Sequence, residues 1–187
     1  PIILAPTHRA RWDALLVPYA TSNITGADLR FMVTISECQG LQGWFVRRLG
    51  GFPVDPLHPT ISTLRHGVSL LQEGKTLVIF PEGGIFRDGE IHSLKLGIAR
   101  LSLSAELNHP GLGVKIVPMS INYSQPYPNW GTDVSINIGN AINVAEYTNG
   151  TTKQNAKQLT EDLAKALQNL NHQESAITDG QWSTVSQ

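Results

Sequence analysis

Short apolar runs alternate with longer amphipathic segments along the 187 residues of this chain. The apolar runs, which predict buried strands, are 2–5, 30–35, 52–54, 76–80, 115–123 and 134–138. The amphipathic segments, which predict helices, are 12–19, 41–49, 60–74, 94–107 and 154–170. Strands that alternate with helices are typical of a sheet with helices packed on both faces. The sequence therefore predicts a single α/β domain whose central sheet is mixed but mostly parallel and flanked by helices.

The two ends of the chain differ from the part between them. The last predicted helix carries a stripe of leucines at helical spacing, as expected of a helix that packs on a core, and these are Leu159, Leu163, Leu167 and Leu170. Residues 173–187 are polar and aperiodic, so we expect a disordered tail after a folded domain of residues 1–172. The chain begins at Pro1 without an initiator Met or a signal peptide. We therefore expect an N-terminal truncation, with any membrane-anchoring helix upstream.

Composition and charge exclude several classes of protein. Charged residues make up 16% of the chain and hydrophobic residues 41%, which excludes a disordered protein. With 14 Lys and Arg against 15 Asp and Glu, there is no basic field for nucleic acid, so we expect no such partner. No apolar run approaches the roughly 18 residues of a transmembrane helix. Cys38 is the only cysteine, which forbids an internal disulfide and a cysteine-based zinc site, and we interpret it as a small apolar filler.

A histidine and an aspartate flank the predicted junction between the first strand and the first helix. His8 follows strand 2–5, and Asp13 lies at the start of helix 12–19. Side chains five residues apart in one helix diverge by about 140°, so the two meet only if His8 lies in the turn. Asp13 would then accept the N–H of one ring nitrogen and leave the other free to take a proton from a hydroxyl. The alternative is a turn histidine followed by an ordinary acidic residue at a helix N-terminus.

A glycine-rich loop follows the strand predicted at 76–80. It opens with Pro-Glu-Gly-Gly at 81–84. The carboxyl end of a parallel strand is where α/β domains hold their ligands, and backbone amides there can bind an anionic oxygen. Arg87, Lys95 and His92 follow closely and would bring positive charge to the same place. The alternative is an ordinary turn with solvated basic residues.

The motifs of other chemistries are absent from the sequence. No Gly-x-Ser-x-Gly elbow occurs, and Cys38 has no activating neighbour. Residues 74–76 end like a phosphate-binding loop, but Ser69 replaces the leading glycine. The Gly-Leu-Gly at 111–113 lacks the third glycine of a dinucleotide site. No residues have the spacing of metal ligands. A base without a nucleophile predicts direct transfer to a bound hydroxyl, with neither a metal nor a bound cofactor.

Together these motifs resemble those of the glycerolipid acyltransferases, the family that contains the 1-acyl-glycerol-3-phosphate acyltransferases. The hallmark of that family is His-x4-Asp followed later by Phe-Pro-Glu-Gly, and this chain has His8, Asp13 and residues 80–83 in that order. Residues 94–97 are similar to the Lys-x-Gly segment of the family, and residues 117–120 to its apolar-Pro strand. The resemblance implies the α/β fold of glycerol-3-phosphate acyltransferase.

The resemblance spans roughly residues 1–140 and implies a role for each motif. His8 would be the general base and Asp13 its orienting partner, while Glu82 and Gly83 would belong to the acceptor site. The donor would be an acyl thioester of coenzyme A or acyl carrier protein. The acceptor would be a lysophospholipid such as 1-acyl-glycerol-3-phosphate, and the protein would act in phospholipid biosynthesis at the cytoplasmic face of a membrane.

Three expectations for the chemistry follow. His8 removes the proton of the acceptor hydroxyl as that oxygen attacks the thioester. An amide at Gly83 or Gly84 stabilises the oxyanion. Arg87 and Lys95 would bind the phosphate of the acceptor.

The sequence departs from the family at two arginines. The family often continues Phe-Pro-Glu-Gly with Thr-Arg, whereas here the arginine is displaced by two positions, to Arg87. A second arginine is expected after Asp55, where this chain has Pro56. The candidates to replace its charge are Arg47, Arg48 and Arg65. Two other functions stay open: a thioester or ester hydrolase that uses the same base, and a non-catalytic lipid-binding module, which the missing arginine favours.

Overall fold

A seven-stranded sheet forms the centre of the computed structural model, which describes residues 1–25, 29–34, 50–54 and 61–182. The strands are β1 (Ile2–Pro6), β2 (Leu29–Thr34), β3 (Gly51–Val54), β4 (Thr76–Val78), β5 (Lys115–Tyr123), β6 (Val134–Ile138) and β7 (Ile142–Asn143). Their order is β3-β2-β4-β1-β5-β6, with β7 paired to β5. Strands β1 to β5 are parallel to one another, whereas β6 and β7 run antiparallel to β5. The expected mixed, mostly parallel sheet is confirmed.

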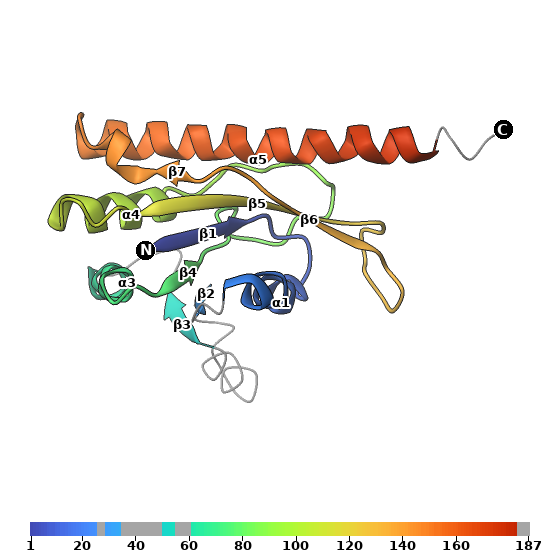
Figure 1. Ribbon diagram of the computed structural model, residues 1–187, viewed down its shortest axis with the longest axis horizontal. Helices are drawn as coiled ribbons and strands as arrows, with labels where there is room; N and C mark the ends of the chain where they lie inside the picture. The colour runs from blue at the N-terminus through green and yellow to red at the C-terminus, as the bar shows by residue number, and fades with distance from the viewer. Residues whose placement is uncertain (26–28, 35–49, 55–60, 183–187) are drawn as a thin grey trace.

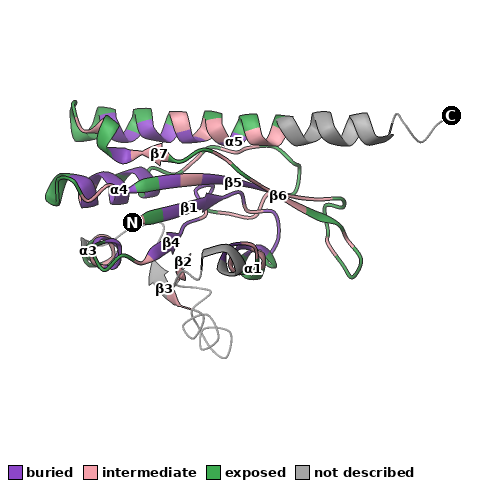
Figure 2. Cartoon of the chain, in the orientation of Figure 1, coloured by how far each residue is buried: buried purple, intermediate pink, exposed green. Residues whose placement is uncertain are grey.

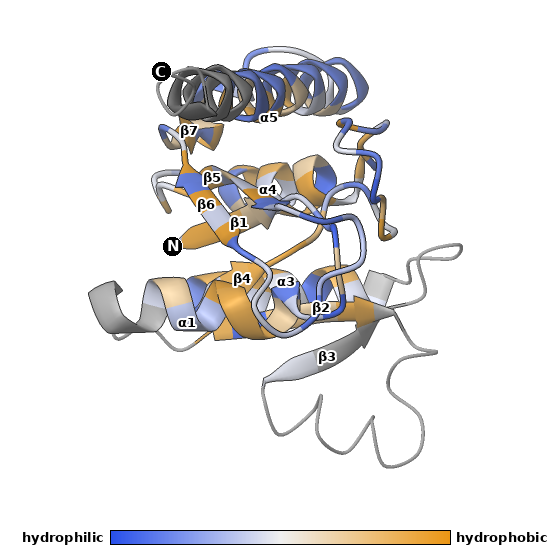
Figure 3. Cartoon of the chain, turned by 90° about the vertical axis from the view of Figure 1, so that its right-hand side faces the viewer, coloured by the Kyte–Doolittle hydropathy of each residue, from blue (hydrophilic) through white to orange (hydrophobic). Residues whose placement is uncertain are grey.

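Helices cover both faces of this sheet. They are α1 (Asp13–Thr25), α3 (Ile61–Gln72), α4 (Gly97–Asn108), the 3-10 helix η2 (Val144–Tyr147) and α5 (Thr152–Trp182). Successive residues of a strand point to opposite faces. On one face, Ile3 of β1 belongs to a core shared with α3, α4 and α5. On the other, Leu4 belongs to a smaller core with Val17 of α1. Helix α5 and strand β3 lie at opposite ends of the molecule (Figures 1 and 3).

The apolar pattern of α5 packs as its spacing predicts. Leu159, Leu163 and Leu167 are completely buried in the larger core, and each leucine buried in this way stabilises the fold by about 1.5–3 kcal/mol. The buried residues of α4 and of the first half of α5 face each other across this core (Figure 2). Strands β1 and β4 are among the more hydrophobic segments of the chain (Figure 3). The two strands that supply the candidate site are therefore fixed within the core.

Several elements differ from their expected limits. Helix α5 continues to Trp182, so the expected disordered tail is corrected for residues 173–182. No Gly or Pro stands between Leu170 and Gly180 to end the helix. Helix α1 continues through Pro18 to Thr25. The short elements β7 and η2 were not expected from the sequence, because two to four residues carry no periodicity.

Three expectations lie outside the described residues. These are the helix at 41–49, the placement of Cys38, and the last residues of the tail at 183–187. Within the described ranges, no helix combines the length and the apolarity that crossing a bilayer requires.

The arrangement of β1 and β4 brings two distant parts of the sequence together. These strands are parallel neighbours, with Leu4 opposite Val78, so their carboxyl ends lie at the same edge of the sheet. Thr7, directly after β1, is clamped to β5: its N–H donates to the Met119 carbonyl, and its hydroxyl accepts the Ile121 N–H at 2.9 Å. The turn that carries His8 therefore leaves the sheet at a fixed point beside the loop that follows β4.

Candidate active site

His8 and Asp13 are in contact, as their spacing predicts. Asp13 is the first residue of α1 and is completely buried. Its Oδ2 lies 2.9 Å from Nδ1 of His8 in the turn after β1. The His8 side chain is 20% exposed, so the imidazole is open to a molecule at the surface. Its ring also stacks on Phe80, with centroids 4.1 Å apart. The strand-turn-helix junction therefore supplies the geometry that a continuous helix could not.

The Asp13 carboxylate is held by donors on both oxygens. Oδ2 accepts the backbone N–H groups of Arg9 at 2.6 Å and Ala10 at 2.8 Å, in addition to His8. Oδ1 accepts the hydroxyl of Tyr123, at the end of β5, at 2.6 Å. A carboxylate surrounded by donors is an acceptor, so the His8 hydrogen bond places the proton on Nδ1. Nε2 is then left with a free lone pair, the state required of a base.

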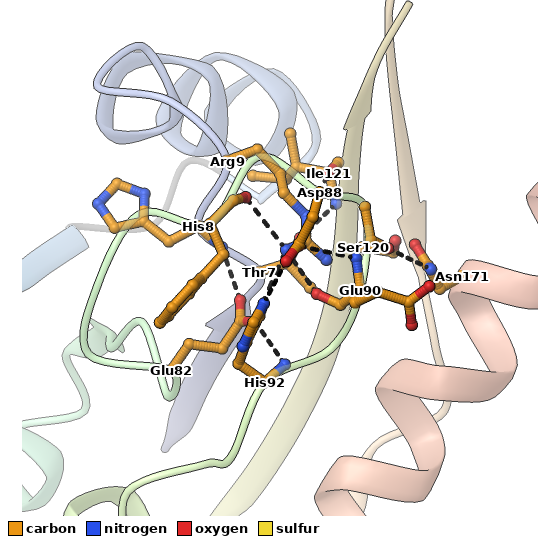
Figure 4. Close-up of polar contacts among 12 residues, drawn as sticks. Thr7, His8, Arg9, Glu82, Asp88, Glu90, His92, Ser120, Ile121 and Asn171 are labelled. Atoms are coloured by element: carbon orange, nitrogen blue, oxygen red, sulfur yellow. Dashed lines mark hydrogen bonds and ion pairs between the residues drawn. The ribbon is translucent and has the colours of Figure 1, made fainter. Parts of the chain in front are cut away.

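Glu82 joins the His8 turn to the loop after β4. It is almost completely buried. Its Oε2 accepts the backbone N–H of His8 at 3.1 Å, and its Oε1 accepts that of His92 at 3.0 Å. Figure 4 shows these contacts, with the His8 imidazole pointing away from them. The carboxylate is thus used within the protein. Its expected contact with the acceptor stays a prediction, and that contact would require the carboxylate to be uncovered.

Arg9 is a buried cation that the sequence analysis did not select. Its Nη1 lies 3.6 Å from Oε1 of Glu82 and donates to the carbonyls of Glu90 at 2.8 Å and Phe86 at 3.3 Å. Its Nε and Nη2 are buried and have no hydrogen-bond partner among the residues that the structure describes. In the sequence, an arginine in a polar turn is indistinguishable from a solvated one. Only the fold reveals it as the counter-ion of Glu82.

The two glycines of the loop have different positions. Gly83 has φ +70°, a backbone conformation that favours glycine, and its N–H donates to the Phe80 carbonyl at 3.2 Å. That amide is therefore occupied. The Gly84 N–H makes no backbone hydrogen bond within the described part of the chain. Of the two expected amide donors, Gly84 is the one with a free N–H.

The basic residues of the loop are spread around the site. Arg87 is exposed, and its guanidinium carbon lies 5.1 Å from the centre of the Tyr127 ring, a cation–π distance. Lys95 is also exposed, and its backbone N–H donates to the Pro81 carbonyl. A Cβ on Gly83 would lie 3.2 Å from Cγ of Lys95. The Lys95 side chain therefore passes directly over the glycine turn.

His92 is used within the loop. Its Nε2 lies 2.8 Å from Oδ2 of Asp88, and its ring stacks on Phe86. The hydrogen bond from His92 is the main reason that the pKa of Asp88 lies below its usual value. The structure therefore gives His92 a partner of its own, separate from the His8 pair.

The other candidates are less well placed. Arg65 is exposed on α3. Arg47, Arg48 and Asp55 lie outside the described residues. Within the described ranges, no group of three or more His, Cys, Asp and Glu side chains is arranged to hold a metal ion.

Comparisons with known proteins find relatives of this chain. The profile of a family described as Acyltransferase matches residues 1–122. The chain is 33% identical to glycerol-3-phosphate O-acyltransferase 1 of Saccharomyces cerevisiae over 106 residues, which are 54% of this chain and 14% of that protein. It is 26% identical to a 1-acyl-sn-glycerol-3-phosphate acyltransferase of Streptococcus pneumoniae over 153 residues, 78% of this chain and 51% of that protein. The chain thus spans about half or less of the length of these curated relatives.

A solved structure has the same fold. The crystal structure of the 1-acyl-sn-glycerophosphate acyltransferase PlsC from Thermotoga maritima superposes with a TM-score of 0.60 at 20% identity. The match covers 92% of this chain and 66% of that one. At this identity the likeness concerns the fold alone.

Proposed function

The chain belongs to the acyltransferase family, and on that premise we propose that it transfers a fatty acyl group from a thioester to the hydroxyl of a lysophospholipid such as 1-acyl-glycerol-3-phosphate. The reaction belongs to phospholipid biosynthesis. The observation that carries the proposal is the hydrogen bond between His8 Nδ1 and the buried Asp13, which leaves Nε2 free at the surface. The relatives named for glycerolipid acyl transfer support the substrate class.

In the proposed reaction, His8 acts first as a base and then as an acid. Nε2 takes the proton of the acceptor hydroxyl as its oxygen attacks the thioester carbonyl carbon. Asp13 stabilises the imidazolium that forms. The free Gly84 amide is the donor that we assign to the tetrahedral oxyanion, because the Gly83 amide is occupied. When the intermediate collapses, the C–S bond breaks and the sulfur takes the proton from His8. Coenzyme A or acyl carrier protein therefore leaves as the free thiol. These steps need neither a metal nor a bound cofactor.

The acceptor phosphate is assigned to the exposed cations of the loop. Arg87 and Lys95 both follow the glycine turn and lie on the surface. Arg87 is a better anchor than a freely moving side chain, since the Tyr127 ring restricts its guanidinium.

The acceptor is a lipid, so we assign the site to a membrane surface, on its cytoplasmic face. The surface beside His8 and Asp13 supports this assignment. Trp12 is 59% exposed directly before α1, and Leu15 and Tyr19 are exposed on α1 itself. Trp and Tyr are the side chains that favour the boundary between lipid and water. Between its buried first residue Asp13 and its end at Thr25, α1 carries no charged residue. A lysophospholipid could then reach His8 without leaving the bilayer.

The direct test is an acyl-transfer assay with purified protein. Lysophosphatidate is paired with long-chain acyl-CoA and, separately, with acyl carrier protein carrying the same chain. Formation of phosphatidate with equal release of thiol is expected with at least one donor. A hydrolase would release thiol and free fatty acid at the same rate without the acceptor. Binding of lysophosphatidate without turnover would identify a lipid-binding module, and either of these results would contradict the proposal.

A further inference from the structure

Tyr123 reaches the catalytic pair from a distant part of the chain. We propose that Tyr123 is a positioning residue: its hydroxyl fixes the Asp13 carboxylate and, through it, the His8 imidazole that the carboxylate orients. The kinetic part of this inference rests on the proposed function. The link from Tyr123 through Asp13 to His8 does not, because it can be measured on the imidazole itself.

The two Asp13 oxygens accept hydrogen bonds from different parts of the chain. Oδ2 serves the turn, since it accepts His8 Nδ1 and the amides of Arg9 and Ala10. Oδ1 accepts the Tyr123 hydroxyl at 2.6 Å and no other hydrogen bond among the described residues. The tyrosine therefore holds the half of the carboxylate that the turn leaves unsupported.

The position of Tyr123 is fixed by the sheet. It is the last residue of β5, two residues beyond Ile121, and both side chains pack with the smaller core beneath α1. Ile121 is also the residue that Thr7 clamps from the end of β1. The hydroxyl of Tyr123 and the turn of His8 are therefore held by the same pair of hydrogen-bonded strands.

The chemical effect follows from the charge on Asp13. A hydroxyl that donates to a carboxylate disperses its negative charge. A carboxylate with less charge at Oδ2 stabilises an imidazolium at His8 less than a carboxylate without the tyrosine donor would. Burial and the neighbouring Asp13 raise the pKa of Tyr123 above its usual value, so the phenol remains a donor at the pH of an assay.

Among the described residues, no ionisable side chain other than Tyr123 forms a hydrogen bond or ion pair with the side chains of the His8–Asp13 pair. Glu82 and Arg9 pair with one another behind the turn, where Glu82 accepts the His8 backbone N–H rather than the ring. Lys95 passes over Gly83. His92 and Asp88 are paired within the loop. Helix α1 has no acid or base after Asp13 except the exposed Tyr19, and β6 has none at all.

The test is a titration of the His8 imidazole by NMR. The chain has six histidines, and comparison with His8→Gln identifies the signal. Tyr123→Phe removes the donor, so the titration of the His8 signal should move to higher pH. The acid limb of kcat/KM for acyl transfer should move upward by the same amount. On the plateau, kcat should fall about 3- to 10-fold with KM unchanged, because Asp13 is less well fixed.

The chain offers a matched control. The Tyr147 hydroxyl donates to Asp162 at 3.1 Å, between η2 and α5, and burial with Asp162 raises the pKa of Tyr147 to about 12. Tyr147→Phe therefore removes a tyrosine–aspartate bond of the same kind away from His8. It should leave both the His8 titration and acyl transfer unchanged.

A second substitution avoids any loss of packing. Replacing Tyr123 by 3,5-difluorotyrosine keeps the hydroxyl and makes it a stronger donor, so the titration of the His8 signal should move to lower pH. Opposite shifts in the two variants would support the inference. An unchanged His8 titration in both, or equal shifts in Tyr147→Phe, would overturn it. If the shifts occur but no acyl transfer is found with any thioester, the proposed function fails while the role of Tyr123 stands.

Discussion

The buried pair of Arg9 and Glu82 makes a sharp prediction about stability. Their side chains are 5% and 0% exposed, and Nη1 lies 3.6 Å from Oε1. Removing one partner of a buried pair leaves an uncompensated charge, which costs about 3–5 kcal/mol. We expect Arg9→Met to lie at the lower end, about 3 kcal/mol, because Glu82 keeps two backbone donors and two Arg9 nitrogens lack partners among the described residues.

The double variant distinguishes a charge effect from a packing effect. Glu82→Gln leaves the Arg9 cation buried without its anion, and a similar loss of about 3 kcal/mol is expected. Arg9→Met with Glu82→Gln removes both charges, and the Gln amide oxygen can still accept a backbone N–H. The double variant should therefore cost no more than either single one, a coupling of at least about 3 kcal/mol.

Urea unfolding followed by circular dichroism measures all three variants by linear extrapolation. Arg11→Met is the matched control, since Arg11 is exposed in the same turn, and it should change the free energy of unfolding by less than about 0.5 kcal/mol. Additive losses in the double variant would refute the reasoning. So would an Arg9→Met variant as stable as Arg11→Met.

The other predictions concern substrate and membrane. Arg87→Ala should raise KM for a phosphorylated acceptor by about tenfold, the effect of losing a charged contact to the ground state, and steady-state kinetics that show only a lower kcat would contradict phosphate binding. Trp12→Ala should weaken sedimentation with vesicles of phosphatidylcholine and phosphatidate by several-fold, since Trp12 is 59% exposed beside the site. Leu107→Ala is its control, because Leu107 is 43% exposed at the far end of α4. Equal binding by both variants would contradict the assignment of Trp12 and α1 to the membrane-binding surface.

The sequence predicted those parts of the fold that depend on local pattern. Strands β5 and β6 have the expected limits, because turn segments rich in Gly, Pro and polar residues leave little choice of boundary. Strand β4 ends at Val78 rather than Phe80, although the Ile79 N–H still donates to Leu4. Helix α4 begins at Gly97 rather than Leu94, because Lys95 is hydrogen-bonded back onto the loop.

In the candidate site, too, only the contacts between residues close in the sequence were predictable. The contact of His8 with Asp13 was predictable, since a single turn joins them. The hydroxyl of Tyr123 was not, because 110 residues separate it from Asp13 and only the pairing of β1 with β5 brings them together. The burial of Arg9 and Glu82 likewise depends on the parallel register of β1 and β4. Residue type identified these groups as polar but could not show which of them face one another.

The central claim is that His8 is the base of acyl transfer. The measurement that tests it most directly is the turnover of His8→Ala with lysophosphatidate and the thioester that supports activity in the parent protein. His109→Ala, exposed after α4, is the control and should retain full activity. We expect His8→Ala to lose about 10²- to 10⁴-fold in kcat, the usual effect of removing a general base, while its unfolding curve stays close to that of the parent. Turnover of a folded His8→Ala protein at the parent rate would contradict the claim.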